Sequence, residues 1–470
     1  MAGEAPFALV YLGRVPRDPQ EMDEAMGMML TYIYTTLPNP PVHDDARLTA
    51  LAASSDGVDR VSGLPDELLR NIVARLPVKD AARTTVLSSS WRALWPSTPL
   101  VLADGHLLPE RQRWSPTPGY SSLAAPAVSR ILEAHPGPFR CVHLVCNNMA
   151  AHRAQLARWL HLLAAKGVQD LVLVNRPWPR DVTLPVTLFT ITTLTRLYFG
   201  MWKLPDTAAR GLCGASFPHL HELGVCCVGM EHGVLDSLVA SSPVLEVLNI
   251  LECVDGLRLR IVSKSLRCVQ ISCSIMETIA VVKAPRLERL IHSSPCGVAR
   301  RLPTRIEIGD APKLHVLGFL EPTQVLQIRD TINMSEKCDK PTGDYLTLEF
   351  WEESGPIESI HSRISMMSFK DFTGDPAEVG FLEFFCRRAG ALKTASVYLA
   401  SPSFIPFSKD EAFAKVRYSS RNRASKSCKI TVFGCNGPLK GEVWRFKDGA
   451  DFSVLDPFSA VDWTGSRWKP

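Results

Sequence analysis

The stretch "SLVASSPVLEVLNI", residues 237–250, contains both parts of a unit that recurs along the chain. The first part continues an apolar pattern of helical spacing that begins at Val234 and ends before Pro243, which predicts a short helix. The second part, "LEVLNI", alternates in the manner of a strand. Side chains of a strand point alternately to its two sides, so Leu248 and Ile250 are expected in one shared core.

The strand pattern returns at a nearly constant interval. Six copies begin Leu-x-x-Leu/Val, and their starts are separated by 26, 25, 21, 21 and 27 residues. An interval of about 20 to 29 residues is typical of leucine-rich repeats, which stack because no single unit can bury its apolar face. The clear copies start at Leu194, Leu220, Leu245, Leu266, Leu287 and Leu314, and two weaker copies start at Phe139 and Val168.

The odd positions of these strands are expected to line the concave face of the predicted solenoid. Their mixture of charge, amide and aromatic groups suits protein recognition, because Tyr and Arg are enriched at binding hot spots. The alternative is that they are solvated strand residues without a binding role. The candidate target-binding residues are Arg196, Tyr198, Glu222, Asn249, Gln270 and Arg289.

Upstream, "VSGLPDELLRNIVARLPVKDAARTTVLSSSWRALW", residues 61–95, predicts three short helices. Pro65 suits a first helical position, and acidic residues follow it at the positive end of the helix dipole. Asp80 is expected to cap the second helix, and Ser88 or Ser90 the third. Three such helices expose more apolar surface than their own core can hide, so this module docks on the rest of the chain or on another protein.

This module resembles the F-box of plant F-box proteins. The resemblance rests on two Leu-Pro pairs, at 64–65 and 76–77, and on Ser88-x-x-Trp91-Arg92, while Ser90 stands where many members carry Lys or Arg. It implies docking onto a Skp-type adaptor, which links such proteins to the cullin and RING subunits of an SCF ubiquitin ligase. An internal helical hairpin is the alternative. By the resemblance, the adaptor surface is formed or supported by Leu64, Pro65, Leu68, Ile72, Leu76, Pro77, Val86 and Trp91.

We therefore expect an α+β chain: an N-terminal three-helix F-box, then a leucine-rich-repeat α/β solenoid, or horseshoe, with a small C-terminal α/β cap. The helix–strand pattern after residue 375 resembles the FBD region of plant F-box proteins. The expected divisions are residues 1–59 (extension and linker), 60–100 (F-box), 101–136 (connecting segment), 137–320 (solenoid), 321–436 (further strands and FBD-like region) and 437–470 (tail). Within residues 1–59 we expect either one helix through Met22, Met26, Met29, Leu30 and Ile33 or a loosely ordered extension.

Composition excludes several classes of function. The net charge is +4 from 52 basic and 48 acidic residues, which gives no electrostatic footprint for nucleic acid. No apolar run reaches the roughly 18 residues of a membrane helix, and no signal peptide is expected. The 13 cysteines form neither a disulfide framework nor a metal pattern, which favours the cytoplasm or nucleus.

No nucleotide-binding, hydrolase or metalloprotease motif is present. His219 and His221 are two residues apart and could in principle bind one metal ion. Their position at the start of a repeat instead favours side chains that face the turn. We therefore expect no catalysis and no cofactor. The hypothesis is a substrate-receptor subunit of a ubiquitin ligase, whose partners are the adaptor and an unknown target protein. A ligase-independent repeat scaffold, with the helical module capping the solenoid, is the alternative, and an enzyme with an unrecognised site is a third.

Overall fold

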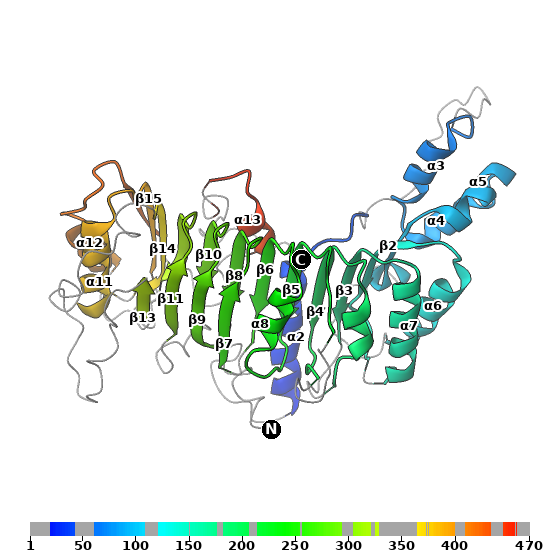
Figure 1. The fold of residues 1–470 in the computed structure, drawn as a ribbon, viewed down its shortest axis with the longest axis horizontal. Helices are drawn as coiled ribbons and strands as arrows, with labels where there is room; N and C mark the ends of the chain where they lie inside the picture. Colours follow the sequence, from blue (N-terminus) through cyan, green and yellow to red (C-terminus); the bar gives the residue numbers. More distant parts are fainter. Residues whose placement is uncertain are drawn as a thin grey trace. The chain divides into compact units, whose positions relative to one another are not determined.

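The structure is a computed structural model in which the chain forms two compact units. One comprises residues 26–230, and the other comprises residues 231–470 together with 1–25. Figure 1 shows the helices and strands of both units. The structure describes residues 19–42, 61–108, 121–149, 151–175, 182–205, 214–253, 256–293, 304–320, 325–328, 364–372, 374, 376–399, 409–433, 445–455 and 457.

The unit of residues 26–230 contains a parallel sheet in which five successive strands pair in chain order. The predicted copies at Phe139, Val168, Leu194 and Leu220 each contribute one of these strands. Helices α6 (Ser121–Ala134) and α7 (Arg153–Ala165) precede β2 and β3 and pack against each other. The strands are β1 (Leu100–Ala103), β2 (Phe139–Leu144), β3 (Asp170–Val174), β4 (Arg196–Gly200) and β5 (Glu222–Cys226).

The module at residues 61–95 forms three short helices, α3 (Asp66–Val73), α4 (Val78–Thr84) and α5 (Ser89–Leu94). Ser88 caps α5, because its Oγ accepts from the backbone N–H of Trp91 at 3.4 Å. The prediction that Asp80 caps α4 is wrong. The N-cap is Pro77, whose extended backbone leads directly into the helix. Asp80 already lies within the first turn and forms an ion pair with Arg83 of the last turn.

Over residues 247–328 of the second unit the chain passes alternately between two parallel sheets, so each repeat there supplies one strand to each. The sequence pattern predicts the strands of the first sheet and not those of the second. The first sheet has the order β6 (Val247–Leu251), β8 (Cys268–Ser272), β10 (Arg289–His292), β12 (Val316–Leu320), β14 (Met366–Phe372), β15 (Thr394–Leu399) and β16 (Lys429–Phe433). The second has the order β13 (Val325–Ile328), β11 (Arg305–Asp310), β9 (Met276–Lys283) and β7 (Leu257–Val262).

Three of the described helices of this unit agree with the sequence pattern. Helix α8 (Val234–Ala240) is the predicted short helix before the strand of "LEVLNI". Helix α11 (Pro376–Arg388) contains the predicted apolar face of the FBD-like region, and α12 (Lys409–Ser419) precedes β16. A last short helix, α13 (Phe446–Ala450), was not predicted.

The fourth and sixth positions of each repeat form the core, as predicted. Leu223, Val225, Leu248 and Ile250 are all buried. The residue that follows each of four strands adopts a left-handed backbone although none is glycine, and the cost of this conformation is met by the stacked repeats around it. These residues are Met201, Cys227, Glu252 and Cys273, with φ of 64°, 53°, 54° and 49°.

The predicted N-terminal helix is α2 (Pro19–Thr36). Met29, Leu30 and Ile33 are buried in it, while the side chains of Met22 and Met26 lie outside the described part of the chain. After the helix, Val42 packs with Val101 of β1 and Cys141 of β2. Cys141 is in register with Asp170, Arg196 and Glu222, so this N-terminal segment covers part of the sheet face that carries the odd strand positions.

Candidate functional site

An apolar stripe lies exposed on α3. Leu68 and Ile72 are four residues apart in α3, the spacing that places side chains on one side of a helix, and Leu64 lies just before the helix begins. They are 36%, 51% and 38% exposed. Leu69 and Val73, on the other side of α3, are buried. The helix therefore uses one apolar side for its own packing and presents a second to its surroundings.

The other residues predicted for the adaptor surface divide into exposed and supporting positions. Pro65 and Val86 are exposed, and Leu76 and Pro77 are half-buried. Trp91 is buried, and its indole Nε1 donates a hydrogen bond to Ser62 Oγ at 2.8 Å. Trp91 thus holds the start of the module against α5 and does not contribute surface of its own.

The helical module is attached to the first strand of the sheet. Pro77 forms a parallel bridge with Val101 of β1, and α4 packs against that strand. Lys79 Nζ donates to the carbonyl oxygen of Leu107 at 3.0 Å. These contacts involve α4, so they leave the stripe on α3 uncovered.

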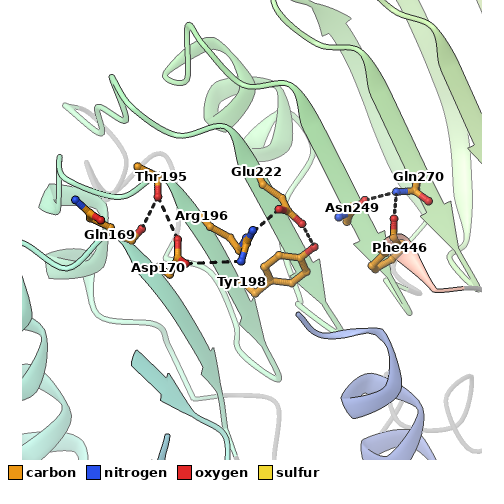
Figure 2. A network of polar contacts seen from close by, with 9 residues as sticks. All are labelled: Gln169, Asp170, Thr195, Arg196, Tyr198, Glu222, Asn249, Gln270 and Phe446. Atoms are coloured by element: carbon orange, nitrogen blue, oxygen red, sulfur yellow. Dashed lines mark hydrogen bonds and ion pairs between the residues drawn. The ribbon is translucent and has the colours of Figure 1, made fainter. Parts of the chain in front are cut away.

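On the sheet of the first unit, three predicted target-binding residues contact one another (Figure 2). Arg196 Nε donates to Glu222 Oε2 at 2.9 Å, and its Nη1 lies 3.7 Å from Asp170 Oδ2. Tyr198 Oη donates to Glu222 Oε1 at 2.5 Å. Burial by itself lowers the pKa of Arg196, but the carboxylates of Glu222 and Asp170 outweigh it and hold that pKa above its ordinary value.

The expectation that odd strand positions are open to a partner is wrong for Tyr198, which is only 1% exposed. Arg196 and Glu222 remain half-buried. The tyrosine ring lies flat against the neighbouring strand, where Gly224 provides the room for it. The sequence signal was present, because a glycine in register with a large aromatic residue often marks a close approach.

The expectation also fails for Asn249, Gln270 and Arg289, which are 0%, 0% and 2% exposed. They point to the predicted face, but residues 445–455, which we call the strap, cover them. Gln270 Nε2 donates to Asn249 Oδ1 and to the carbonyl oxygen of Phe446, each at 2.9 Å (Figure 2).

Arg289 makes the most contacts with the strap. Its Nη1 donates to the carbonyl oxygens of Gly449 at 2.7 Å and Asp451 at 3.0 Å, and its Nη2 donates to that of Val454. Arg289 and Gly449 are separated by 160 residues. No local sequence pattern could have indicated this contact, because strand periodicity describes which face a residue points to and not what covers that face.

Other candidate chemistry is limited in the described part of the chain. His219 and His221 are exposed, and the described residues contain no group of three or more metal-ligating side chains. Among the same residues, no helix has both the length and the apolar character needed to cross a membrane.

Three family models match the sequence. The model described as F-box domain matches residues 61–102, and the one described as FBD matches residues 352–397. Between them, residues 156–344 match the model described as the leucine-rich repeats of the FBD-associated F-box protein At5g56370. The helical module, the repeat strands and the start of the C-terminal α/β region thus each correspond to a match.

The chain is also similar to curated proteins of Arabidopsis thaliana. It is 32% identical to the F-box/LRR-repeat protein At3g26922 over 149 residues, which is 32% of this chain and 46% of the relative. It is 29% identical to the F-box/FBD/LRR-repeat protein At1g13570 over 194 residues, which is 41% of this chain and 44% of the relative. The matches thus span about half the length of these relatives. Together with the three family models, they identify the chain as an F-box protein of the plant type, with leucine-rich repeats and a C-terminal FBD region.

Proposed function

We propose that this chain is the substrate-recognition subunit of an SCF-type cullin-RING ubiquitin ligase. In this proposal the F-box docks onto a Skp-type adaptor through Leu64, Leu68 and Ile72, with Pro65, Leu76, Pro77 and Val86 around them and Trp91 as internal support. The adaptor then connects the chain to the cullin and RING subunits. F-box domains in general bind such adaptors.

The observation that carries the proposal is the exposed apolar stripe on α3. Fully burying a Leu or Ile side chain is worth about 1.5–3 kcal/mol relative to leaving it in water. Leu64, Leu68 and Ile72 expose between a third and a half of their surface. A partner that covered the exposed part of all three would gain about 2–4 kcal/mol of binding free energy. Contiguous exposed apolar surface of this kind marks protein–protein contact sites.

The repeats would present the target. We propose that the strands form one leucine-rich-repeat solenoid, a horseshoe, and that its inner face takes part in target binding. Arg196 and Glu222 are the partly open positions of that face, whereas Tyr198, Asn249, Gln270 and Arg289 are covered. The chain itself would be non-catalytic and without a cofactor. Its contribution is proximity, because holding a target lysine near the ubiquitin thioester raises the effective concentration of the two groups. Cytoplasm and nucleus, where the nine described cysteines would stay reduced, are the proposed locations.

The proposal is tested by measuring binding of the purified chain to a Skp-type adaptor by isothermal titration calorimetry. Leu68→Asp places a charge in the stripe and is expected to weaken binding at least tenfold. The matched control is Leu123→Asp, which changes a leucine of similar exposure, 59% against 51%, at the corresponding end of α6. Adaptor binding that is unaffected by Leu68→Asp, or lost equally in both variants, contradicts the docking assignment.

A second candidate function is a ligase-independent scaffold in which the helical module only caps the repeats. The bridge between Pro77 and Val101 favours it, because α4 covers the outer strand β1. Under this alternative the unmodified chain does not bind the adaptor, and disrupting the packing of α4 lowers the stability of the whole unit. The calorimetric titration of the unmodified chain therefore distinguishes the two functions.

A further inference from the structure

The strap makes its polar contacts with the sheet through its main chain. Gln270 donates to the carbonyl oxygen of Phe446, and Cys268 Sγ lies 3.4 Å from that of Gly449. Arg289 donates to the carbonyl oxygens of Gly449, Asp451 and Val454. All of these partners are backbone oxygen atoms of the strap. The sheet therefore recognises the path of the strap and not the identity of most of its side chains, so another peptide in the same turn can make the same hydrogen bonds.

Two aromatic side chains of the strap are also held: Phe446 is buried, at 1% exposed, and Phe452 contacts two arginines. The ring of Phe452 stacks on the guanidinium of Arg267, whose Cζ lies 3.7 Å from the ring centroid, and Arg289 Cζ lies 5.1 Å from the same centroid. Contacts of this type between a guanidinium and an aromatic ring are attractive, most strongly where water is excluded. The surface made by Arg267, Cys268, Gln270 and Arg289, which we call the strap site, thus selects a turn with an aromatic residue.

The two arginines of the strap site differ in their charge balance. Arg267 Nε donates to Glu288 Oε1 at 2.7 Å, which compensates its charge. Arg289 has only carbonyl oxygens as hydrogen-bond acceptors among the described residues, and its Nε has no acceptor there. Arg289 makes no ion pair among the described residues, although the carboxylates of Glu288 and Asp451 act on it from further away. A carboxylate that binds a guanidinium through two parallel hydrogen bonds adds both energy and geometric specificity. A ligand with a carboxylate at this point would therefore bind Arg289 better than the strap does.

The strap is also placed so that it can leave. Lys447, Asp451, Ser453 and Leu455 are exposed, so one side of the segment faces solvent. Its departure returns Arg289 to water and leaves no unpaired buried charge, which removes the usual penalty for separating a buried charged group from its partners.

We propose that the strap is an internal ligand of the strap site, and that the site takes a peptide turn of the target that offers an aromatic ring to Arg267 and a carboxylate to Arg289. Only the assignment of this peptide to a ligase target rests on the proposed function. Peptide binding itself does not require the adaptor.

The test uses the full chain and a labelled peptide of the strap sequence, RFKDGADFSV, residues 445–454. One form ends in a free carboxylate where the Val454 carbonyl accepts from Arg289, and the other ends in an amide. Binding is measured by fluorescence anisotropy. Phe452→Ala in the chain weakens the tethered strap and leaves the site intact, so it is expected to raise peptide affinity at least tenfold. Phe413→Ala, which changes an exposed phenylalanine on α12, is the matched control and should behave as the unmodified chain.

The carboxylate form is expected to bind the Phe452→Ala chain about fivefold more tightly than the amide form. Adding Arg289→Gln should abolish this difference. Equal affinity of the two peptide forms overturns the assignment of a carboxylate to Arg289. Equal affinity of the Phe452→Ala and unmodified chains overturns the internal-ligand assignment.

Hydrogen exchange on the unmodified chain gives a second measurement, which does not depend on whether a substituted chain folds. Saturating peptide is expected to speed exchange at the strap amides and not at β8 or β10. If the strap amides exchange only together with those strands, the strap is an integral part of the fold and the inference fails. Adaptor binding is measured on the same samples: peptide binding without adaptor binding contradicts the proposed function alone, and the reverse result contradicts this inference alone.

Discussion

The ring of Tyr198 lies directly over Gly224 on the adjacent strand. A Cβ atom added at position 224 would lie 2.0 Å from Tyr198 Cδ1 and 2.2 Å from Cε1. The two residues are in register between β4 and β5, and the tyrosine hydroxyl reaches on to Glu222. The glycine is thus required by the tyrosine, and the pair connects two repeats.

Gly224→Ala is therefore expected to destabilise the first unit by about 1–3 kcal/mol, the usual cost of forcing extra volume into a packed site. Chemical denaturation measures it. Combining Gly224→Ala with Tyr198→Leu should recover part of the loss, because the shorter side chain removes the clash. If the two substitutions are simply additive, the ring and the glycine do not constrain each other.

The Arg196–Glu222 pair is expected to contribute only about 0.5–1 kcal/mol. Its side chains are 37% and 24% exposed, so solvent screens the attraction. A double-mutant cycle with Arg196→Met and Glu222→Gln isolates the coupling, since Gln keeps an acceptor for Tyr198. Raising the salt concentration from 0.1 M to 1 M should reduce the coupling. A coupling that is large and insensitive to salt would show that the pair is effectively buried.

Two kinds of substitution in the F-box should abolish adaptor binding for different reasons. Leu64→Ala with Pro65→Ala removes exposed groups, so adaptor co-purification should be lost while the repeats stay folded. Trp91→Ala removes a buried ring and the hydrogen bond to Ser62, with an expected cost of about 3–5 kcal/mol. Thermal denaturation distinguishes the two variants, because only Trp91→Ala is expected to lower the melting temperature. A destabilised double alanine variant would mean that Leu64 and Pro65 support the module and do not form its surface.

Acid is expected to destabilise the first unit through His143. Burial, together with smaller contributions from the positive charge of Arg196 and from His106, lowers the pKa of this histidine from 6.5 to about 3. Below pH 6.5 the unfolded chain binds a proton that the folded chain binds only near pH 3, so stability falls as the pH falls. The loss is about 1.4 kcal/mol per pH unit for this one group.

His143→Leu should remove that loss, so the difference in unfolding free energy between pH 6.5 and pH 4.5 should shrink by about 2–3 kcal/mol. Denaturant titrations at the two pH values measure it. His161→Leu, at an exposed position of α7, is the control and should keep the pH dependence of the unmodified chain. An unchanged pH dependence in His143→Leu would show that this histidine is protonated in the folded chain.

The sequence predicted what depends on local pattern. The repeat strands and their core positions, such as Leu248 and Ile250, follow from apolar alternation, and the helices of the F-box follow from apolar spacing and proline. The second sheet was not predicted although β7 alternates buried and exposed residues along its whole length, because the strands of that sheet do not share a recurring Leu-x-x-Leu/Val pattern.

What covers a face could not be predicted in the same way. Asn249, Gln270 and Arg289 carry the polarity of an open binding face, and the strap that buries them comes from more than 150 residues away. Tyr198 is hidden by packing between neighbouring repeats. For Leu68 and Ile72 the opposite holds: their apolar character is typical of a core, and their exposure becomes understandable only if a partner is expected.

The alternation between two sheets has a consequence for how this chain can change its length. From β6 to β13, each strand of one sheet is followed by a strand of the other, so the unit that can be gained or lost is a pair of strands. An insertion containing a single strand would send every later strand to the opposite sheet and turn its buried side chains outward. Genetic change in this region is therefore restricted to steps of a whole repeat, and shorter insertions are confined to the turns between strands.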